Sequence, residues 1–169
     1  MKPACEVEIL FDFTRSGASS WLAIDDVVMG GLSHSGMRIE NGRAIFEGMV
    51  SLEHGGGFAS VRSRPSHWDL KAYAGIEVTL RGDGRRYKLR LKSDLNLDGI
   101  SWETAFTTEA GERQTIHFPF RDLAPVYRGT HVPDTPPFNS SHIATFGFLI
   151  SDKQAGPFRL EIETLAAYR

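Results

Sequence analysis

The sequence feature that most constrains the fold is a recurring two-residue alternation of apolar and polar side chains. It is clearest over residues 86–92, where three apolar side chains alternate with Lys88, Arg90 and Lys92. Successive side chains of a β-strand point to opposite faces, so this run predicts a strand with one apolar and one basic face. Few windows show the 3.6-residue period of a helix. The alternation therefore predicts an all-β protein.

Turn residues cut the alternating pattern into about ten short segments, each long enough for one strand. The predicted strands cover residues 7–13, 36–39, 44–50, 58–63, 75–81, 86–92, 101–107, 114–118, 143–151 and 158–166. The dipeptide Asn41-Gly42 predicts a hairpin turn, because both residue types accept positive φ. The glycine-containing residues 82–85 predict a second hairpin, which would join the strands at 75–81 and 86–92.

The connections between these strands predict how the sheets are arranged. Most are short, but a proline-rich connection over residues 121–141 is long enough to return the chain across the molecule. Many short strands with one long crossover and no internal repeat are typical of a two-sheet jelly roll. No linker-like change of composition divides the chain, so we expect one β-sandwich domain over residues 1–169.

Composition and charge exclude several classes of protein. The net charge is −2, which gives no overall field that would attract nucleic acid or an anionic membrane. The longest apolar runs are a few residues, whereas a membrane-spanning helix needs about 20. Glu6 and Glu8 lie where a signal peptide has its apolar core, and the single cysteine, Cys5, suits a reducing compartment. We therefore expect a cytoplasmic protein.

The densest run of unusual residues covers positions 21–33, where a tryptophan precedes two adjacent aspartates and a pair of glycines. Neighbouring carboxylates repel, so we expect Asp25 and Asp26 to organise this loop first and to contact a ligand second. We predict a polar pair between Asp26 and Arg62 that ties the loop to the sheet. The side chains predicted to pack the interior of the sandwich are Trp21, Phe58, Tyr87 and Phe158.

Six short motifs, in this order, give the chain a resemblance to a known family. They are Trp21 with Asp25-Asp26-Val27-Val28-Met29-Gly30-Gly31-Leu32-Ser33, Gly56-Gly57-Phe58-Ala59-Ser60-Val61-Arg62, Arg81-Gly82-Asp83-Gly84-Arg85-Arg86-Tyr87, Phe118-Pro119-Phe120, Arg128-Gly129, and Gly156-Pro157-Phe158-Arg159-Leu160-Glu161-Ile162. Together they resemble the complex I intermediate-associated protein 30 family, and the resemblance covers residues 21–166. The resemblance implies a galactose-binding-like β-sandwich, which agrees with the jelly roll predicted above.

The resemblance also implies a function. Eukaryotic members of the family assist the assembly of respiratory complex I by binding assembly intermediates. We therefore expect a non-catalytic, chaperone-like assembly factor or scaffold that binds another protein. From the N-terminal residues we expect no mitochondrial targeting extension, and the resemblance implies a chain as short as the stand-alone bacterial members of the family.

The sequence leaves two other binding functions open. One ligand class is carbohydrate or another small molecule, because jelly rolls also serve as sugar-binding modules. The side chains suited to a sugar are Asp83, Arg90, Trp102 and Glu103. The other class is RNA, which Arg62 and the basic strand at 86–92 would attract, provided that exposed aromatic side chains accompany them. With Arg128 from the fifth motif, the candidate binding or loop-organising residues are Asp25, Asp26, Arg62, Asp83, Arg90, Trp102, Glu103 and Arg128.

The remaining motifs are incomplete. Residues 94–99 begin like a calcium loop, with Asp94, Asn96 and Asp98, but the twelfth position is Ala105 where a glutamate is needed. Residues 31–36 lack the second flanking glycine of a nucleophile elbow, because position 35 is serine. The six histidines show no paired ligand spacing. We therefore predict no catalytic residue, no metal and no cofactor, with weak calcium binding at residues 94–98 left open.

Overall fold

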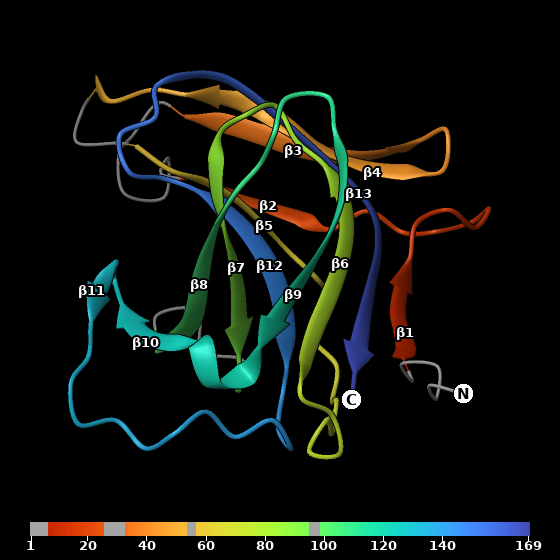
Figure 1. Cartoon of the computed structure of the whole chain (residues 1–169). Coiled ribbons are helices and arrows are strands. Elements are labelled where there is room, and N and C mark those ends of the chain that lie inside the picture. The colour runs from red at the N-terminus through yellow and green to blue at the C-terminus, as the bar shows by residue number, and fades with distance from the viewer. Residues whose placement is uncertain (1–6, 26–32, 54–56, 95–98) are drawn as a thin grey trace.

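The computed structural model describes residues 7–25, 33–53, 57–94 and 99–169, and these form two antiparallel sheets packed face to face (Figure 1). The six-stranded sheet contains β1 (Val7–Asp12), β3 (His34–Glu40), β4 (Arg43–Val50), β6 (Gly75–Arg81), β9 (Arg113–Pro119) and β13 (Gly156–Tyr168). The seven-stranded sheet contains β2 (Leu22–Asp25), β5 (Ala59–Arg62), β7 (Arg86–Lys92), β8 (Ser101–Thr107), β10 (Ala124–Tyr127), β11 (Thr130–His131) and β12 (Thr145–Ile150). A short 3-10 helix, η3 (Phe120–Asp122), follows β9. The predicted all-β, two-sheet jelly roll is confirmed.

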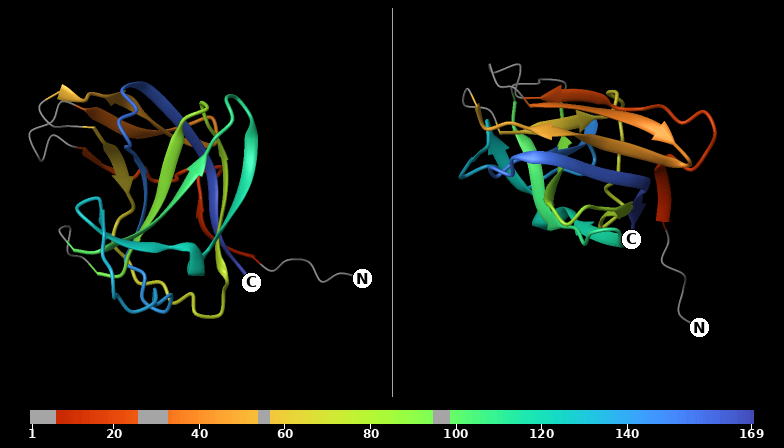
Figure 2. Two further views of the ribbon diagram at one scale, coloured as in Figure 1. Left: turned by 60° about the vertical axis from the view of Figure 1, so that its left-hand side comes forward. Right: turned by 90° about the horizontal axis from the view of Figure 1, so that it is seen from above.

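The order of the strands places the last strand of the sequence in the middle of the six-stranded sheet. That order is β3-β4-β13-β6-β9, and the seven-stranded order is β11-β10-β8-β7-β12-β5-β2. β13 pairs with β4 through residues 156–162 and with β6 through residues 161–168. β1 pairs with residues 164–168 of β13. Figure 2 shows β13 running through its sheet alongside β4.

The core lies between the two sheets and is rich in aromatic rings. The Trp21 ring stacks on Phe148 with centroids 5.8 Å apart, and Phe46 meets Phe158 edge-on at 4.8 Å. The predicted interior positions of Trp21, Tyr87 and Phe158 are confirmed, because these side chains are buried, whereas Phe58 is half-buried. Each ring removes a large apolar area from water, which is the main stabilising term for a sandwich of this kind.

The hairpin predicted between residues 75–81 and 86–92 is wrong. β6 pairs with β13 and β9 in one sheet, and β7 pairs with β12 and β8 in the other, so the two strands lie in opposite layers. Residues 82–85 therefore cross between the sheets. The reason is that both strands have an apolar face, and facing each other across the core buries both faces.

The crossing segment is fixed by hydrogen bonds to Asp83. Its carboxylate accepts from the backbone N–H of Arg85 (3.1 Å), the hydroxyl of Tyr87 (3.0 Å) and the backbone N–H of Arg159 (2.7 Å). Burial, followed by the charge of Asp83, raises the pKa of Tyr87 above its ordinary value. A side chain at Gly82 would start 2.1 Å from Thr108, so the chain passes where only glycine fits. Asp83 thus has a structural role in joining the sheets.

Two further connections differ in how well the sequence predicted them. Asn41 and Gly42 have φ values of 51° and 74° and close the β3–β4 hairpin, as predicted. The connection over residues 121–141 contains β10 and β11, which were not predicted. Pro125 lies within β10 and has no N–H, but its carbonyl accepts a hydrogen bond from Val132 at 3.0 Å.

Candidate functional site

The outer face of the seven-stranded sheet carries the basic strand singled out in the sequence. Tyr87, Leu89 and Leu91 of β7 are buried in the core, so Lys88, Arg90 and Lys92 lie on the opposite face, as the alternation predicted. We call this surface the basic face and define it by the side chains of Arg62, Lys88, Arg90, Lys92, Glu103 and the position of Gly147.

Strand pairing brings several of these residues into one row across the sheet. Arg62 of β5 pairs with Gly147 of β12, and Gly147 pairs on its other side with Arg90 of β7. Arg90 pairs with Glu103 of β8. Directly paired residues point to the same face of a sheet, so Arg62, Arg90 and Glu103 share the basic face although they are far apart in the sequence.

Glu103 neutralises and orients Arg90. One carboxylate oxygen, Oε2, accepts from Nε of Arg90 at 2.7 Å and lies 2.5 Å from its Nη2. The Glu103 side chain is 7% exposed and the Arg90 side chain 28% exposed. A charge-assisted pair with so little contact with water is held more firmly than an exposed pair.

Arg62 is in a different electrostatic state. Among the residues that the structure describes, no carboxylate or carbonyl accepts a hydrogen bond from its guanidinium. Partial burial, followed by the charge of Arg90, lowers the pKa of Arg62. Both effects disfavour the cation, which nevertheless stays protonated at neutral pH because arginine is so strong a base. The face therefore holds one positive charge that the described part of the chain does not balance.

The two lysines of the face are already engaged. Nζ of Lys88 lies 3.3 Å from Oδ1 of Asp152. Nζ of Lys92 donates to the carbonyls of Gly99 and Ile100, both at 3.3 Å, and its side chain is almost fully buried. Lys92 therefore holds the segment before β8 and contributes little to the exposed surface, which the sequence pattern alone did not indicate.

The remaining candidate residues lie away from this row. Trp102 points to the inner side of β8 and packs against Phe138, with ring centroids 5.3 Å apart, so it does not share a face with its neighbour Glu103. Asp83 is on the link between the sheets. The guanidinium of Arg128 lies 5.4 Å from the ring of Tyr127. Asp25 ends β2, and Asp26 lies outside the described residues, so the predicted Asp26–Arg62 pair stays a prediction.

This separation removes the geometric basis for the sugar site expected from the sequence. Asp83, Arg90 and Trp102 do not converge, and no Phe, Tyr or Trp occupies a strand position on the basic face among the described residues. Stacking platforms of this kind are also what single-stranded RNA binding needs. Among the residues described here, no group of three or more His, Cys, Asp or Glu side chains is placed to hold a metal. Asn96 and Asp98 of the possible calcium loop lie outside those residues.

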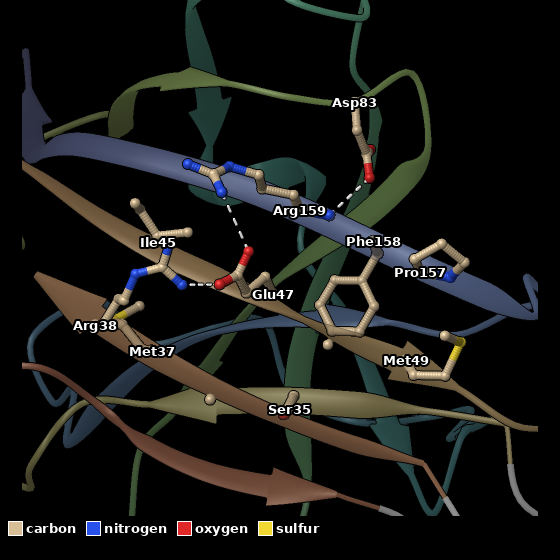
Figure 3. Close-up of a pocket in the computed structure, with 12 residues that line it drawn as sticks. Ser35, Met37, Arg38, Ile45, Glu47, Met49, Asp83, Pro157, Phe158 and Arg159 are labelled. Carbon is tan, nitrogen blue, oxygen red and sulfur yellow. Dashed lines mark hydrogen bonds and ion pairs between the residues drawn. The ribbon is translucent and has the colours of Figure 1, made fainter. Parts of the chain in front are cut away.

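The outer face of the six-stranded sheet is the other charged surface. Glu47 pairs with both Arg38 and Arg159 (Figure 3). Arg159 also pairs with Glu161 at 2.9 Å. Glu161 lies near Arg43 as well, at 3.3 Å. We call this surface the ion-paired face, defined by Arg38, Arg43, Glu47, Arg81, Arg159 and Glu161.

A shallow hollow of about 730 Å³ lies on the ion-paired face. Ile45, Met49 and Pro157 line it next to the Arg38–Glu47–Arg159 pairs. Its charged groups already satisfy one another, so it offers a ligand few free hydrogen-bonding groups. The basic face is therefore the better candidate site.

One residue of the candidate site was missed from the sequence. Gly147 separates the two arginines of the row, and it lies between Phe146 and Phe148 in a strand that is buried throughout. A glycine inside an apolar strand is a signal of close backbone approach, and this signal was present in the sequence. Its position between Arg62 and Arg90 depends on pairing between distant segments, which the sequence pattern does not give.

A family model and several curated proteins are similar to this chain in sequence. A family model described as Complex I intermediate-associated protein 30 (CIA30) matches residues 11–162. An uncharacterized protein of Schizosaccharomyces pombe is 30% identical over 167 residues, which cover 86% of this chain and 76% of that protein. The mitochondrial complex I intermediate-associated protein 30 of Drosophila melanogaster is 25% identical over 182 residues, covering 94% of this chain and 62% of that protein.

The relatives also bear on length and location. The mitochondrial complex I intermediate-associated protein 30 of Neurospora crassa is 26% identical over 102 residues, covering 59% of this chain and 36% of that protein. The chain thus spans less than two thirds of the length of each of these two relatives, both of which are named for complex I. Their names give no support to the predicted cytoplasmic location. No helix in the described part of the chain is long and apolar enough to cross a membrane.

Solved structures resemble this fold closely. The family 11 carbohydrate-binding module of a Clostridium thermocellum cellulosomal cellulase aligns with a TM-score of 0.75 and 15% identity, over 99% of this chain and 97% of that chain. The family 11 module in complex with a β-1,3-1,4-mixed-linked tetrasaccharide aligns with a TM-score of 0.73 and 16% identity, over 98% and 96% of the two chains. At such low identity the likeness concerns the fold alone.

Proposed function

This chain belongs to the complex I intermediate-associated protein 30 family, and on that basis we propose that it is a non-catalytic binding domain that holds a partner protein during assembly of a respiratory complex. The relatives named for this family carry complex I in their names, and the chain matches the family model over nearly its whole length. These names support an assembly intermediate as the proposed partner, which the domain would bind as a scaffold.

The observation that supports a particular binding surface is the unbalanced charge of the basic face. Asp152 pairs with Lys88 and Glu103 pairs with Arg90, whereas no described carboxylate pairs with Arg62. On the ion-paired face, by contrast, each defining arginine has a carboxylate within 4 Å. Unbalanced charge attracts a complementary surface and speeds encounter with it. We infer that the partner presents an acidic patch to the basic face.

The same groups favour binding over catalysis. The carboxylate of the face, Glu103, is bound to Arg90, so it is not free to act as a general base. Arginine and lysine side chains in ion pairs serve to recognise anions and to position them.

The experiment is quantitative co-purification from respiratory membranes of the source organism. The wild-type chain is expected to enrich complex I subunits. Replacing Arg62 and Lys88 by glutamate should remove that enrichment. The matched control replaces Arg43 and Arg113 by glutamate on the outer face of the other sheet, which changes the net charge by the same amount and should leave the enrichment intact. Equal recovery with both double variants would contradict the proposed face.

Location is tested separately. Fractionation of source cells with an antibody against this chain distinguishes the predicted cytoplasmic location from the mitochondrial one in the relatives' names. Whichever location is found, an assembly function requires that part of the protein is recovered with the respiratory membranes.

A further inference from the structure

The centre of the basic face has the geometry of an anion site. Arg62 and Arg90 lie in one row with a single strand, β12, between them. Neighbouring strands are about 4.8 Å apart, so the two backbone positions are about 10 Å apart. Both side chains rise from the same face of the sheet, on either side of β12.

Gly147 places no side chain of its own between the two arginines, and the glycine itself is buried. A Cβ atom at this position would lie 2.6 Å from the backbone carbonyl oxygen of Val61, a contact that the neighbouring strand would have to move to relieve. The row itself therefore places no side chain between Arg62 and Arg90. Any group that fills the gap must come from outside the row.

The two arginines differ in their hydrogen bonding. Arg90 is held by Glu103 through Nε and Nη2, which fixes the direction of its guanidinium and leaves Nη1 without a described acceptor. Arg62 has no described acceptor at all. Partial burial and the charge of Arg90 disfavour its protonated form. Two cations this close are stabilised by an anion placed between them.

The neighbouring residue in the row indicates what the anion is attached to. Leu22 of β2 pairs with Arg62 on the outer edge, and its side chain is 64% exposed. An exposed leucine beside a guanidinium suits a charged group carried on an aliphatic stem, because the stem then has an apolar surface to contact. Planar guanidinium groups match the two oxygens of a carboxylate.

We propose that Arg62 and Arg90 bind a carboxylate over Gly147, supplied by an acidic side chain or the C-terminus of a polypeptide. That the polypeptide is the assembly partner rests on the proposed function, whereas the carboxylate site itself does not. An internal glutamate and a free C-terminal carboxylate share the same chemistry, so the experiment separates these two sources.

The test is an NMR titration of the labelled chain, following the side-chain Nε–H signals of its arginines. Acetate should shift the signals of Arg62 and Arg90 saturably and leave that of Arg113 unchanged. A short peptide with one internal glutamate and blocked ends is compared with a leucine-rich peptide that has a free C-terminus. The peptide that binds more tightly identifies the source of the carboxylate.

The key variant is Arg62→Gln, because Arg62 has no described partner and its loss should leave the fold intact. Acetate affinity should fall about ten-fold or more. Arg113→Gln, on the other sheet, is the control and should change nothing. The melting temperature of each variant confirms that the domain is folded.

Four results would overturn the proposal. The first is no saturable shift, and the second is an equal shift of Arg113. The third is tighter binding of inorganic phosphate than of acetate, which would change the ligand class. The fourth is acetate binding that appears only after Asp26→Asn, because the internal Asp26–Arg62 pair predicted from the sequence would then occupy the site. If acetate binds in the titration but the co-purification recovers no partner, the proposed function is contradicted and the carboxylate site is not.

Discussion

The outer faces of the two sheets carry similar side chains in different arrangements. On the ion-paired face, Glu47 and Glu161 are each shared by at least two arginines, so cations and carboxylates alternate across neighbouring strands. On the basic face, Glu103 serves Arg90 alone and Arg62 has no described acceptor. The first arrangement is self-sufficient, and the second leaves charge for a ligand. Counting charged residues would not distinguish them, but pairing does.

The largest expected difference between the faces concerns their carboxylates. Glu103→Ala would leave Arg90 beside Arg62 with no described counter-charge, and we expect a loss of about 3 kcal/mol in the free energy of unfolding, because the pair is mostly buried. Glu47→Ala removes a more exposed carboxylate and should cost less than about 1 kcal/mol. Urea denaturation measures both, and equal losses would contradict the contrast between the faces.

Replacing a glycine by alanine should lower the stability of the chain on one sheet and raise it on the other. Gly147→Ala places a Cβ atom against the carbonyl of Val61 and should destabilise the chain by about 2 kcal/mol. Gly36→Ala on β3 meets nothing within 4 Å and should stabilise it by about 0.5 kcal/mol, because alanine loses less backbone entropy on folding. Thermal unfolding of the two variants checks the signs. A tolerated Gly147→Ala would show that β12 can shift, and that the gap between the arginines is adjustable.

Replacing an arginine on each face should show whether that arginine contributes to the stability of the fold. Arg62→Met is expected to change the free energy of unfolding by no more than about 0.5 kcal/mol, since no described interaction is lost. Arg159→Met loses pairs with Glu47 and Glu161 and should cost about 1 kcal/mol. Calorimetry compares the two. A large loss of stability in Arg62→Met would instead support a structural partner for Arg62.

The smallest expected effect is that of salt. Raising the ionic strength from 0.1 M to 1 M shortens the screening length from about 10 Å to about 3 Å. Affinity for the partner should fall several-fold, whereas the melting temperature should hardly change, because the core is apolar. Affinity that does not respond to salt would argue for an apolar interface, such as the hollow lined by Met49 and Pro157.

The sequence predicted local structure better than it predicted which strands pair. The alternation over residues 86–92 identified both faces of β7, and Asn41-Gly42 identified the β3–β4 turn, since each depends on side chains a few residues apart. The predicted hairpin at residues 82–85 was wrong because an apolar face does not reveal which sheet a strand joins. β10 was missed because Pro125 is unusual in a strand.

The candidate site shows the same limit. Arg62, Arg90 and Glu103 were all singled out from the sequence, but their place in one row follows from pairing of β5, β12, β7 and β8. Trp102 and Glu103 were both candidates for a sugar site, but adjacent residues of a strand point to opposite faces, so only one of the two could share the face with Arg90. The sequence therefore predicted which residues are candidates, but it did not predict which of them are neighbours across the sheet.

The central place of β13 has a consequence for the order of synthesis. β4 ends at Val50 and its partner begins at Gly156, so the ribosome adds about 100 residues in between, which takes about 5–20 seconds at the usual rates. During that time β1, β4 and β6 have apolar faces and unpaired edges, which is when a nascent chain is open to aggregation. A stop codon that removes β13 would leave three strands without their shared neighbour, so an early termination near residue 155 should yield no folded product.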